Sequence, residues 1–172
     1  MRMGVRRQQR QVRKTLLAVG EGDSEVAFLT HLRDLYCSRR EGVSVSVRNA
    51  HGKGPEHVIG YAVKLSQRFC YDACVVLLDT DIEWADRVTK SARKSGIEMV
   101  GSMPCLEGLL LAILGHRPPE RCLQCKKQIE KLLDLDLMER QSYAGSFSRP
   151  VLDLSRKGIA ELDRLLRCFE GC

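Results

Sequence analysis

The chain has 172 residues, of which 44% are hydrophobic and 29% are charged, and its formal net charge is +6. This length suits one domain with a core of its own. No apolar run is long enough to span a membrane, and the first residues lack the apolar stretch of a signal peptide. These features argue against an integral membrane protein and predict a cytoplasmic one without a membrane partner.

The positive charge is concentrated at the N-terminus. Residues 1–14 carry basic side chains and no acid, and the rest of the chain is formally neutral; the basic residues are Arg2, Arg6, Arg7, Arg10, Arg13 and Lys14. A basic arm on a neutral body suits a polyanion such as DNA or RNA, which makes Arg6, Arg7 and Arg10 candidate substrate-binding residues. The alternative is a solvated leader without a specific role.

The spacing of apolar residues predicts alternating strands and helices. In chain order we expect a strand at 15–19, a helix at 25–37 with Ser24 as its N-cap, a strand at 43–47 and, after a glycine-rich loop, a helix at 55–69 with Val58, Ile59, Ala62, Leu65 and Phe69 facing inward. A strand at 73–78, a helix at 84–95, a strand at 97–101 and an apolar helix at 106–114 follow. A helix at 120–133, a loop at 141–150 and a helix at 157–169 complete the chain.

Such alternation predicts an α/β fold with a mainly parallel four-stranded sheet and helices on both faces. We expect residues 1–14 to form the basic arm and residues 15–172 to form a single domain. The core of that domain is expected at about 15–130, followed by a C-terminal helical extension. The sequence shows no internal repeat and no clear second domain.

Two acidic clusters follow predicted strands. Glu21 and Glu25 come after the strand at 15–19, and Asp79 and Asp81 come after the apolar strand at 73–78. Ligands of open α/β sheets bind at the carboxyl ends of the strands, and two acidic clusters gathered there need a counter-ion. A hard divalent cation is the natural candidate, because such cations prefer carboxylate oxygens.

Glu107 follows the fourth predicted strand and is therefore expected at the same edge of the sheet. The spacing of Asp79 and Asp81 places both side chains on one side of an extended backbone, where they could share a metal. Other interpretations stay open. Glu25 and Glu107 each lie in the first turn of a predicted helix, where an acid is favourable in any case, and Asp-x-Asp is also common in exposed turns.

The chain contains eight cysteines. Without a secretory signal we expect reduced thiols rather than a disulfide framework. Cys122 and Cys125 have the spacing of zinc ligands, and a structural Zn²⁺ completed by Cys168 and Cys172, or by His116, is the less favoured alternative.

The sequence resembles the Toprim domain of topoisomerases, primases and overcoming-lysogenization-defect (OLD) nucleases over roughly residues 15–130. The resemblance is carried by Glu21-Gly22-Asp23-Ser24-Glu25 followed by Asp79-Thr80-Asp81. The string Pro104-Cys105-Leu106-Glu107, which leads into an apolar helix, is similar to a later motif of the RloB-like branch. Gly108 departs from that branch, which usually has a bulky residue at this position.

The resemblance implies that Glu21, Asp79 and Asp81 form the metal-binding core, with Glu25 and Glu107 as additional metal-binding or water-positioning acids. It also implies Mg²⁺- or Mn²⁺-dependent cleavage of phosphodiester bonds and, for the RloB-like branch, a role in defence against phage. OLD-type nucleases use a basic residue near the metals. The candidates for this residue are Lys53, Lys126 and Lys127, with Lys53 ahead because its loop should open on the same edge, and His51 in that loop could bind phosphate.

Two functions from different classes are therefore expected. The first is a metal-dependent nuclease acting on DNA or RNA, with another Toprim phosphotransfer as its rival among enzymes. The second is a nucleic-acid-binding or partner-interaction module with a degenerate site, working beside a partner ATPase.

Overall fold

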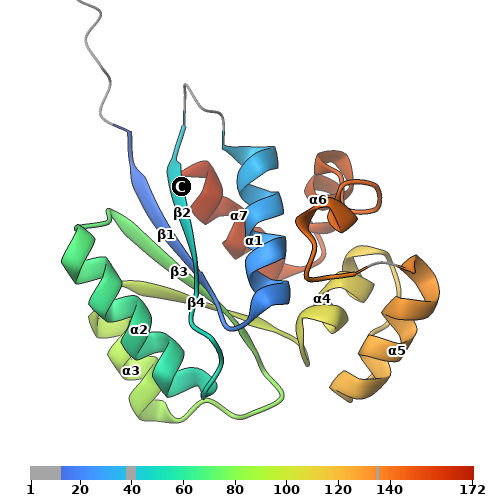
Figure 1. Ribbon diagram of the computed structural model, residues 1–172, viewed down its shortest axis with the longest axis horizontal. Helices are drawn as coiled ribbons and strands as arrows, with labels where there is room; N and C mark the ends of the chain where they lie inside the picture. Colours follow the sequence, from blue (N-terminus) through green and yellow to red (C-terminus); the bar gives the residue numbers. More distant parts are fainter. Residues whose placement is uncertain (1–12, 38–41, 135) are drawn as a thin grey trace, which may run out of the picture.

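The computed structural model describes residues 13–37, 42–134 and 136–172 (Figure 1). Its strands are β1 (Thr15–Gly20), β2 (Ser44–Asn49), β3 (Ala73–Asp79) and β4 (Ile97–Ser102). Its helices are α1 (Asp23–Tyr36), α2 (Gly54–Phe69), α3 (Asp86–Lys94), α4 (Leu106–Ile113), α5 (Cys122–Leu133), α6 (Arg149–Ser155) and α7 (Ala160–Glu170), and a short 3-10 helix, η1 (Arg140–Tyr143), precedes α6. None of the helices within these described ranges is long and apolar enough to cross a membrane.

The strands form one sheet in the order β2-β1-β3-β4, and every neighbouring pair is parallel. The predicted α/β fold is therefore confirmed, with a parallel sheet and flanking helices consistent with a Toprim-like, Rossmann-like arrangement. The chain runs from β1 outward to β2 and returns to β3 on the other side of β1. This reversal creates a topological switch point between the carboxyl ends of β1 and β3, where open α/β sheets bind ligands.

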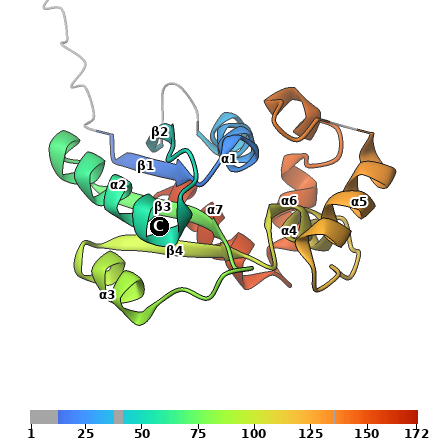
Figure 2. The same ribbon diagram turned by 60° about the horizontal axis from the view of Figure 1, so that its bottom comes forward.

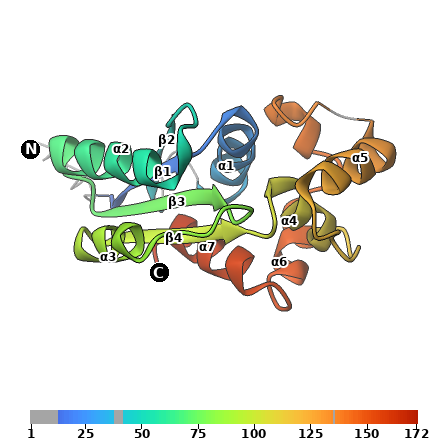
Figure 3. The same ribbon diagram turned by 90° about the horizontal axis from the view of Figure 1, so that it is seen from below.

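Helices flank the sheet (Figures 2 and 3). A separate hydrophobic cluster covers each of its two faces. Along β1, Leu16 and Ala18 belong to the cluster that includes α1 and α7, whereas Leu17 and Val19 belong to the cluster that includes α2 and α3. Burial on both faces explains why β1 is a continuous apolar run rather than an alternating one.

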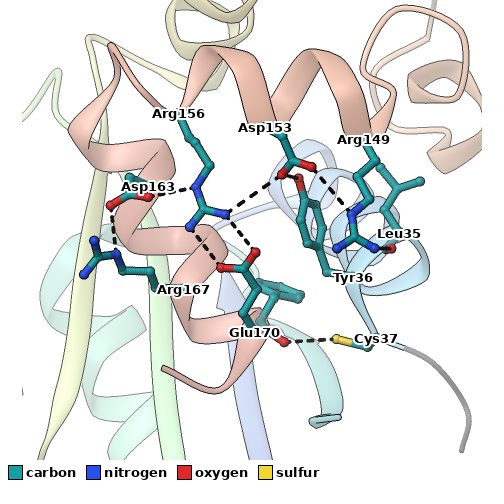
Figure 4. Close-up of polar contacts among 10 residues, drawn as sticks. Leu35, Tyr36, Cys37, Arg149, Asp153, Arg156, Asp163, Arg167 and Glu170 are labelled. Carbon is teal, nitrogen blue, oxygen red and sulfur yellow. Dashed lines mark hydrogen bonds and ion pairs between the residues drawn. The ribbon is translucent and has the colours of Figure 1, made fainter. Parts of the chain in front are cut away.

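The helices of the C-terminal third of the chain occupy two different positions relative to the sheet. α4, α5 and α6 lie beyond the carboxyl ends of the strands, and α7 returns to pack against β3 and β4 (Figures 1 and 3). The segment expected as a helical extension thus supplies part of the cover of the sheet. Arg156, at the end of α6, fixes this return, because its guanidinium donates to Asp163 at 2.8 Å and to Glu170 at 2.8 and 3.0 Å (Figure 4).

The start of α1 differs from the prediction. The helix begins at Asp23 and has Gly22, rather than Ser24, as its N-cap. The reason is local, since the Glu25 carboxylate accepts a hydrogen bond from the Gly22 N–H at 2.9 Å and so closes the first turn two residues earlier.

Three other differences have equally local causes. α3 begins at Asp86 rather than Trp84, whose indole N–H donates to the Asp79 carbonyl oxygen at 3.1 Å instead. Phe69 was expected to face inward, but it is 57% exposed because it is the last residue of α2. The segment 141–150, expected as a loop, contains part of η1 and the first two residues of α6.

Candidate functional site

Carboxylates gather at the switch point of the sheet. Glu21 directly follows β1, Asp79 is the last residue of β3, and Glu25 and Glu107 lie in the first turns of α1 and α4. Glu25 and Glu107 are each only 8% exposed. Glu21 and Glu107 both act electrostatically on Asp79, which in turn acts on Glu25. The structure thus brings these predicted residues together, whereas Asp81 is exposed in the loop after β3.

Asp79 is held in place from two neighbouring elements. Its Oδ1 accepts hydrogen bonds from the Ser102 hydroxyl at 2.9 Å and from the Leu106 N–H at 3.0 Å. Ser102 is the last residue of β4 and is fully buried. No described residue donates a hydrogen bond to Asp79 Oδ2.

Glu25 is fixed by the close packing of α1 on β1. Its carboxylate caps the Gly22 N–H, and its backbone lies directly over Gly20. A Cβ at Gly20 would lie 2.8 Å from Glu25 Cβ and 2.9 Å from the Val26 backbone nitrogen. Only glycine at the end of β1 therefore allows the helix to begin so close to the strand.

Burial and like charge raise the pKa of two of these acids. Burial, followed by repulsion from Asp79 and Glu107, raises the pKa of Glu25 from 4.5 to about 7. Burial, followed by repulsion from Glu107 and Glu21, raises the pKa of Asp79 from 3.8 to about 6. Both directions show that the charged forms receive too little compensating positive charge from the described residues.

Glu107 reaches the cluster because Gly108 follows it. A Cβ at Gly108 would overlap the Met103 carbonyl oxygen and lie 2.7 Å from Pro104 Cδ. A bulky residue cannot occupy this position, which gives a physical reason for the departure from the RloB-like pattern.

One cation contacts the acidic cluster within the described part of the chain. Lys126 of α5 places its Nζ 4.0 Å from Glu107 Oε1, and the lysine side chain is about half exposed. An exposed pair at this distance stabilises weakly. Of the predicted basic candidates, Lys126 is the one that contacts a site carboxylate, and Lys127 is exposed on the same helix.

The loop between β2 and α2 lies against Glu21. The Gly52 N–H donates to the Glu21 carbonyl oxygen at 2.8 Å. His51 and Lys53 have left-handed backbones, with φ of 59° and 72°, and both side chains are exposed. The loop that carries these predicted phosphate-binding residues therefore borders the acidic edge.

The basic arm lies largely outside the described residues. The predicted substrate-binding residues in that part are Arg6, Arg7 and Arg10. The last two arm residues belong to the folded body, since Arg13 Nε donates to the Gly42 carbonyl oxygen at 3.2 Å and Lys14 Nζ donates to the Gly171 carbonyl oxygen at 3.0 Å.

The donor set of the acidic cluster suits Mg²⁺ or Mn²⁺, because it consists of carboxylate oxygens with unbalanced charge. Within the described ranges, however, no group of three His, Cys, Asp or Glu side chains is placed so that it could hold a metal ion. The expected convergence of Glu21, Asp79 and Asp81 on one cation is therefore absent from the side-chain positions. One oxygen of Asp79 is occupied by Ser102 and Leu106, and Asp81 faces solvent.

The thiols group differently from the predicted zinc ligands. Cys122 and Cys125, in the first turn of α5, both interact with Cys105, the N-cap residue of α4. Cys168 lies on α7 near Cys74 and does not join them. Burial raises the pKa of all of these thiols, and among the described residues they form no metal-binding group.

Sequence reasoning does not identify Ser102 or Trp84 as part of this edge. Ser102 becomes significant only once β4 is known to pair with β3, because that pairing sets it beside Asp79. Trp84 carried a usable signal, since it is the single tryptophan of the chain and follows the Asp-x-Asp pair closely.

Comparison with known proteins finds no match to this chain. No family model matches the chain, and no curated protein and no solved structure matches it. The resemblance to the Toprim family therefore rests on the motifs and their order, and the function is inferred from the residues of the site.

Proposed function

We propose that this protein is a metal-dependent phosphodiesterase that cleaves DNA or RNA with Mg²⁺ or Mn²⁺ as its cofactor. The gathering of Glu21, Glu25, Asp79 and Glu107 at the switch point, with the pKa of two of them raised, is the observation that carries the proposal. A crowded set of partly buried acids is the arrangement that a divalent cation stabilises. The Toprim-like motif order supports the same activity, and the string at 104–107 supports an RloB-like role in phage defence.

The chemistry follows from the positions of these residues. A divalent cation, when bound, neutralises the phosphate and acidifies a water molecule. Glu21 and Asp79 are the residues that we assign to holding it, because both lie at the switch point and interact electrostatically. Glu25, whose carboxylate accepts the Gly22 N–H beside Asp79, is the residue that we assign to positioning the water molecule.

Basic side chains flank the acidic edge and favour a polyanionic substrate. His51 and Lys53 border Glu21, and Lys126 contacts Glu107. Groups of this kind bind backbone phosphates without reading sequence. The arm charges at Arg6, Arg7 and Arg10 would add phosphate contacts farther along the strand.

Cleavage assays test this proposal. Purified protein is incubated with plasmid, single-stranded DNA and total RNA in Mg²⁺, Mn²⁺ or EDTA, and we expect cleavage of at least one substrate with metal and none with EDTA. Asp79→Asn should lower the rate on the order of 100-fold, because a charged ligand is lost while size and packing are kept. Glu130→Gln, an exposed change on α5, should cleave like the wild type. Wild-type cleavage by Asp79→Asn would contradict the assignment.

A nucleic-acid-binding or partner-interaction module beside a partner ATPase is the second candidate. The absence of a group of three metal-ligating side chains among the described residues favours it. Thermal unfolding separates the two candidates, because a cation that binds only the folded state raises Tm. A nuclease should show a Tm increase with Mn²⁺ that Asp79→Asn removes, whereas a degenerate module should show no increase in either protein.

A further inference from the structure

A cavity of about 390 Å³ lies along the outer edge of β4. Its walls come from β4, α3 and α7 and from the loop that follows β3. Thr80, which directly follows Asp79, is part of this wall. Ligand pockets in proteins typically measure about 300–1,000 Å³, so the cavity has the size of a small-ligand site.

The wall next to Asp79 is aromatic and firmly held. Trp84, the only tryptophan of the chain, donates its indole N–H to the Asp79 carbonyl oxygen at 3.1 Å. The Trp84 indole and Thr80 both pack onto Gly101, where a Cβ would lie 2.5 Å from Thr80 Cγ2 and 2.9 Å from the indole Cη2. These contacts fix the position of the ring relative to the backbone of a proposed metal ligand.

Two charged side chains in the cavity wall have no partner among the described residues. Arg93 of α3 and Glu161 of α7 make neither a hydrogen bond nor an ion pair there. Glu98 and Arg164, also in the wall, pair with each other at 3.3 Å. The cavity therefore presents an aromatic surface together with one unpaired donor group and one unpaired acceptor group.

A nucleobase matches this combination, because it has a flat π-face and carries donors and acceptors on its edge. We propose that the cavity binds a nucleobase of the nucleic acid, next to the phosphate at the acidic cluster, by stacking it on Trp84 between Arg93 and Glu161. This inference rests on the proposed nuclease function. The hydrogen bond from the indole to Asp79 then sets the spacing between the bound base and the phosphate to be cleaved.

The fluorescence of Trp84 tests base binding directly, since no other tryptophan contributes to the emission. Metal-free protein in EDTA is titrated with adenosine 5′-monophosphate and with ribose 5-phosphate, which carries the phosphate without the base. We expect saturable quenching by the nucleotide and none by the sugar phosphate. An equal response to both compounds, or no response to either, would overturn the proposal.

Two variants separate stacking from the hydrogen bond to Asp79. Trp84→Leu removes both interactions, whereas Trp84→Phe keeps an aromatic face and loses only the indole N–H. We expect the Kd of a labelled single-stranded oligonucleotide in EDTA, measured by anisotropy, to rise roughly 10-fold in Trp84→Leu and only about twofold in Trp84→Phe. Phe69→Leu, an exposed aromatic change on α2, is the control and should leave the Kd unchanged. No change in Trp84→Leu, or equal losses in both Trp84 variants, would overturn stacking.

The experiments distinguish an error in the base-binding proposal from an error in the nuclease proposal. Metal-dependent cleavage by the wild type without quenching by adenosine 5′-monophosphate removes the base pocket and leaves the nuclease. Quenching without cleavage in any metal keeps the pocket and removes the nuclease. A base-independent fluorescence response together with unchanged oligonucleotide binding in Trp84→Leu would remove the base pocket whatever the cleavage result.

Discussion

Asp79 links the two proposed sites through different atoms of one residue. Its side-chain Oδ1 is held by Ser102 and Leu106, and its backbone oxygen accepts the Trp84 indole N–H. The hydrogen bonds from Ser102 and Leu106 favour the ionised carboxylate and lower its pKa. Burial and the neighbouring acids outweigh them, so that the pKa of Asp79 is raised to about 6. The residue is therefore well positioned but electrostatically strained without a counter-ion.

That strain predicts a pH-dependent stability of the metal-free protein. The folded-state pKa values of Asp79 and Glu25, about 6 and about 7, lie above their usual 3.8 and 4.5. Between these values the folded state binds more protons than the unfolded state, so their contribution is fully present below about pH 4 and is lost as the pH rises through 6 and 7. As the pH rises through this range, we expect the free energy of unfolding of the wild type to fall by on the order of 2 kcal/mol per group relative to Asp79→Asn or Glu25→Gln.

Urea unfolding of metal-free protein between pH 4.5 and 8 measures this loss. The asparagine of Asp79→Asn can still accept the hydrogen bonds from Ser102 and Leu106, so the comparison isolates the charge. Glu130→Gln, which changes an exposed acid, should give a curve parallel to that of the wild type. If the plots of unfolding free energy against pH for Asp79→Asn and Glu25→Gln also run parallel to that of the wild type, the carboxylates of the cluster are already neutralised.

Among the elements, the N-termini of α1 and α4 decide how closely the acids meet. Each helix brings an acid of its first turn to the sheet edge, Glu25 in α1 and Glu107 in α4. A helix N-terminus stabilises a nearby anion and so lowers its pKa. The pKa of Glu25 is raised instead, first by burial and then by repulsion from Asp79 and Glu107, so its place in the first turn of a helix does not account for its pKa.

The close approach of α4 to the preceding loop predicts a large effect of Gly108→Ala. The added Cβ would overlap the Met103 carbonyl oxygen, so α4 must shift and carry Glu107 away from Asp79. We expect a loss of about 2–4 kcal/mol in urea unfolding. Gly60→Ala is the matched control, because Gly60 lies within α2 and a Cβ there meets nothing within 4 Å. That variant should gain about 0.5–1 kcal/mol from helix propensity, and a neutral Gly108→Ala would contradict the packing described here.

The sequence predicts the elements whose signals are local. The apolar runs ahead of Glu21 and Asp79 place both residues at strand ends, and the structure brings them to one switch point. Ser102 and Trp84 depend on strand order and loop hydrogen bonds, which no single segment encodes. The start of α6 lies inside the segment 141–150 that is expected as a loop, and Pro150 occupies the first turn of this helix, where proline fits.

At the scale of the whole molecule, Arg13 and Lys14, where the basic arm joins the body, and the acidic cluster lie at opposite ends of β1. The arm joins the body through Arg13 and Lys14, just before β1 begins, and Glu21 directly follows the end of this six-residue strand. At about 3.3 Å per residue the two ends are roughly 20 Å apart. We therefore propose that the arm contributes to binding of the nucleic acid rather than to the chemistry itself.

Deletion of residues 1–12 tests this division of roles while leaving the contacts of Arg13 and Lys14 in place. The deletion removes the charges of Arg2, Arg6, Arg7 and Arg10. For single-stranded DNA, each lost phosphate contact reduces the slope of log K against log salt by about 0.7, so we expect a slope shallower by up to about 3 and weaker binding at low salt. The cleavage rate at saturating protein should stay unchanged, because the acidic cluster is untouched.

Replacing the same four arginines by glutamine keeps the length of the arm and should reproduce the effect. An unchanged slope in both proteins would show that the arm does not contact the nucleic acid.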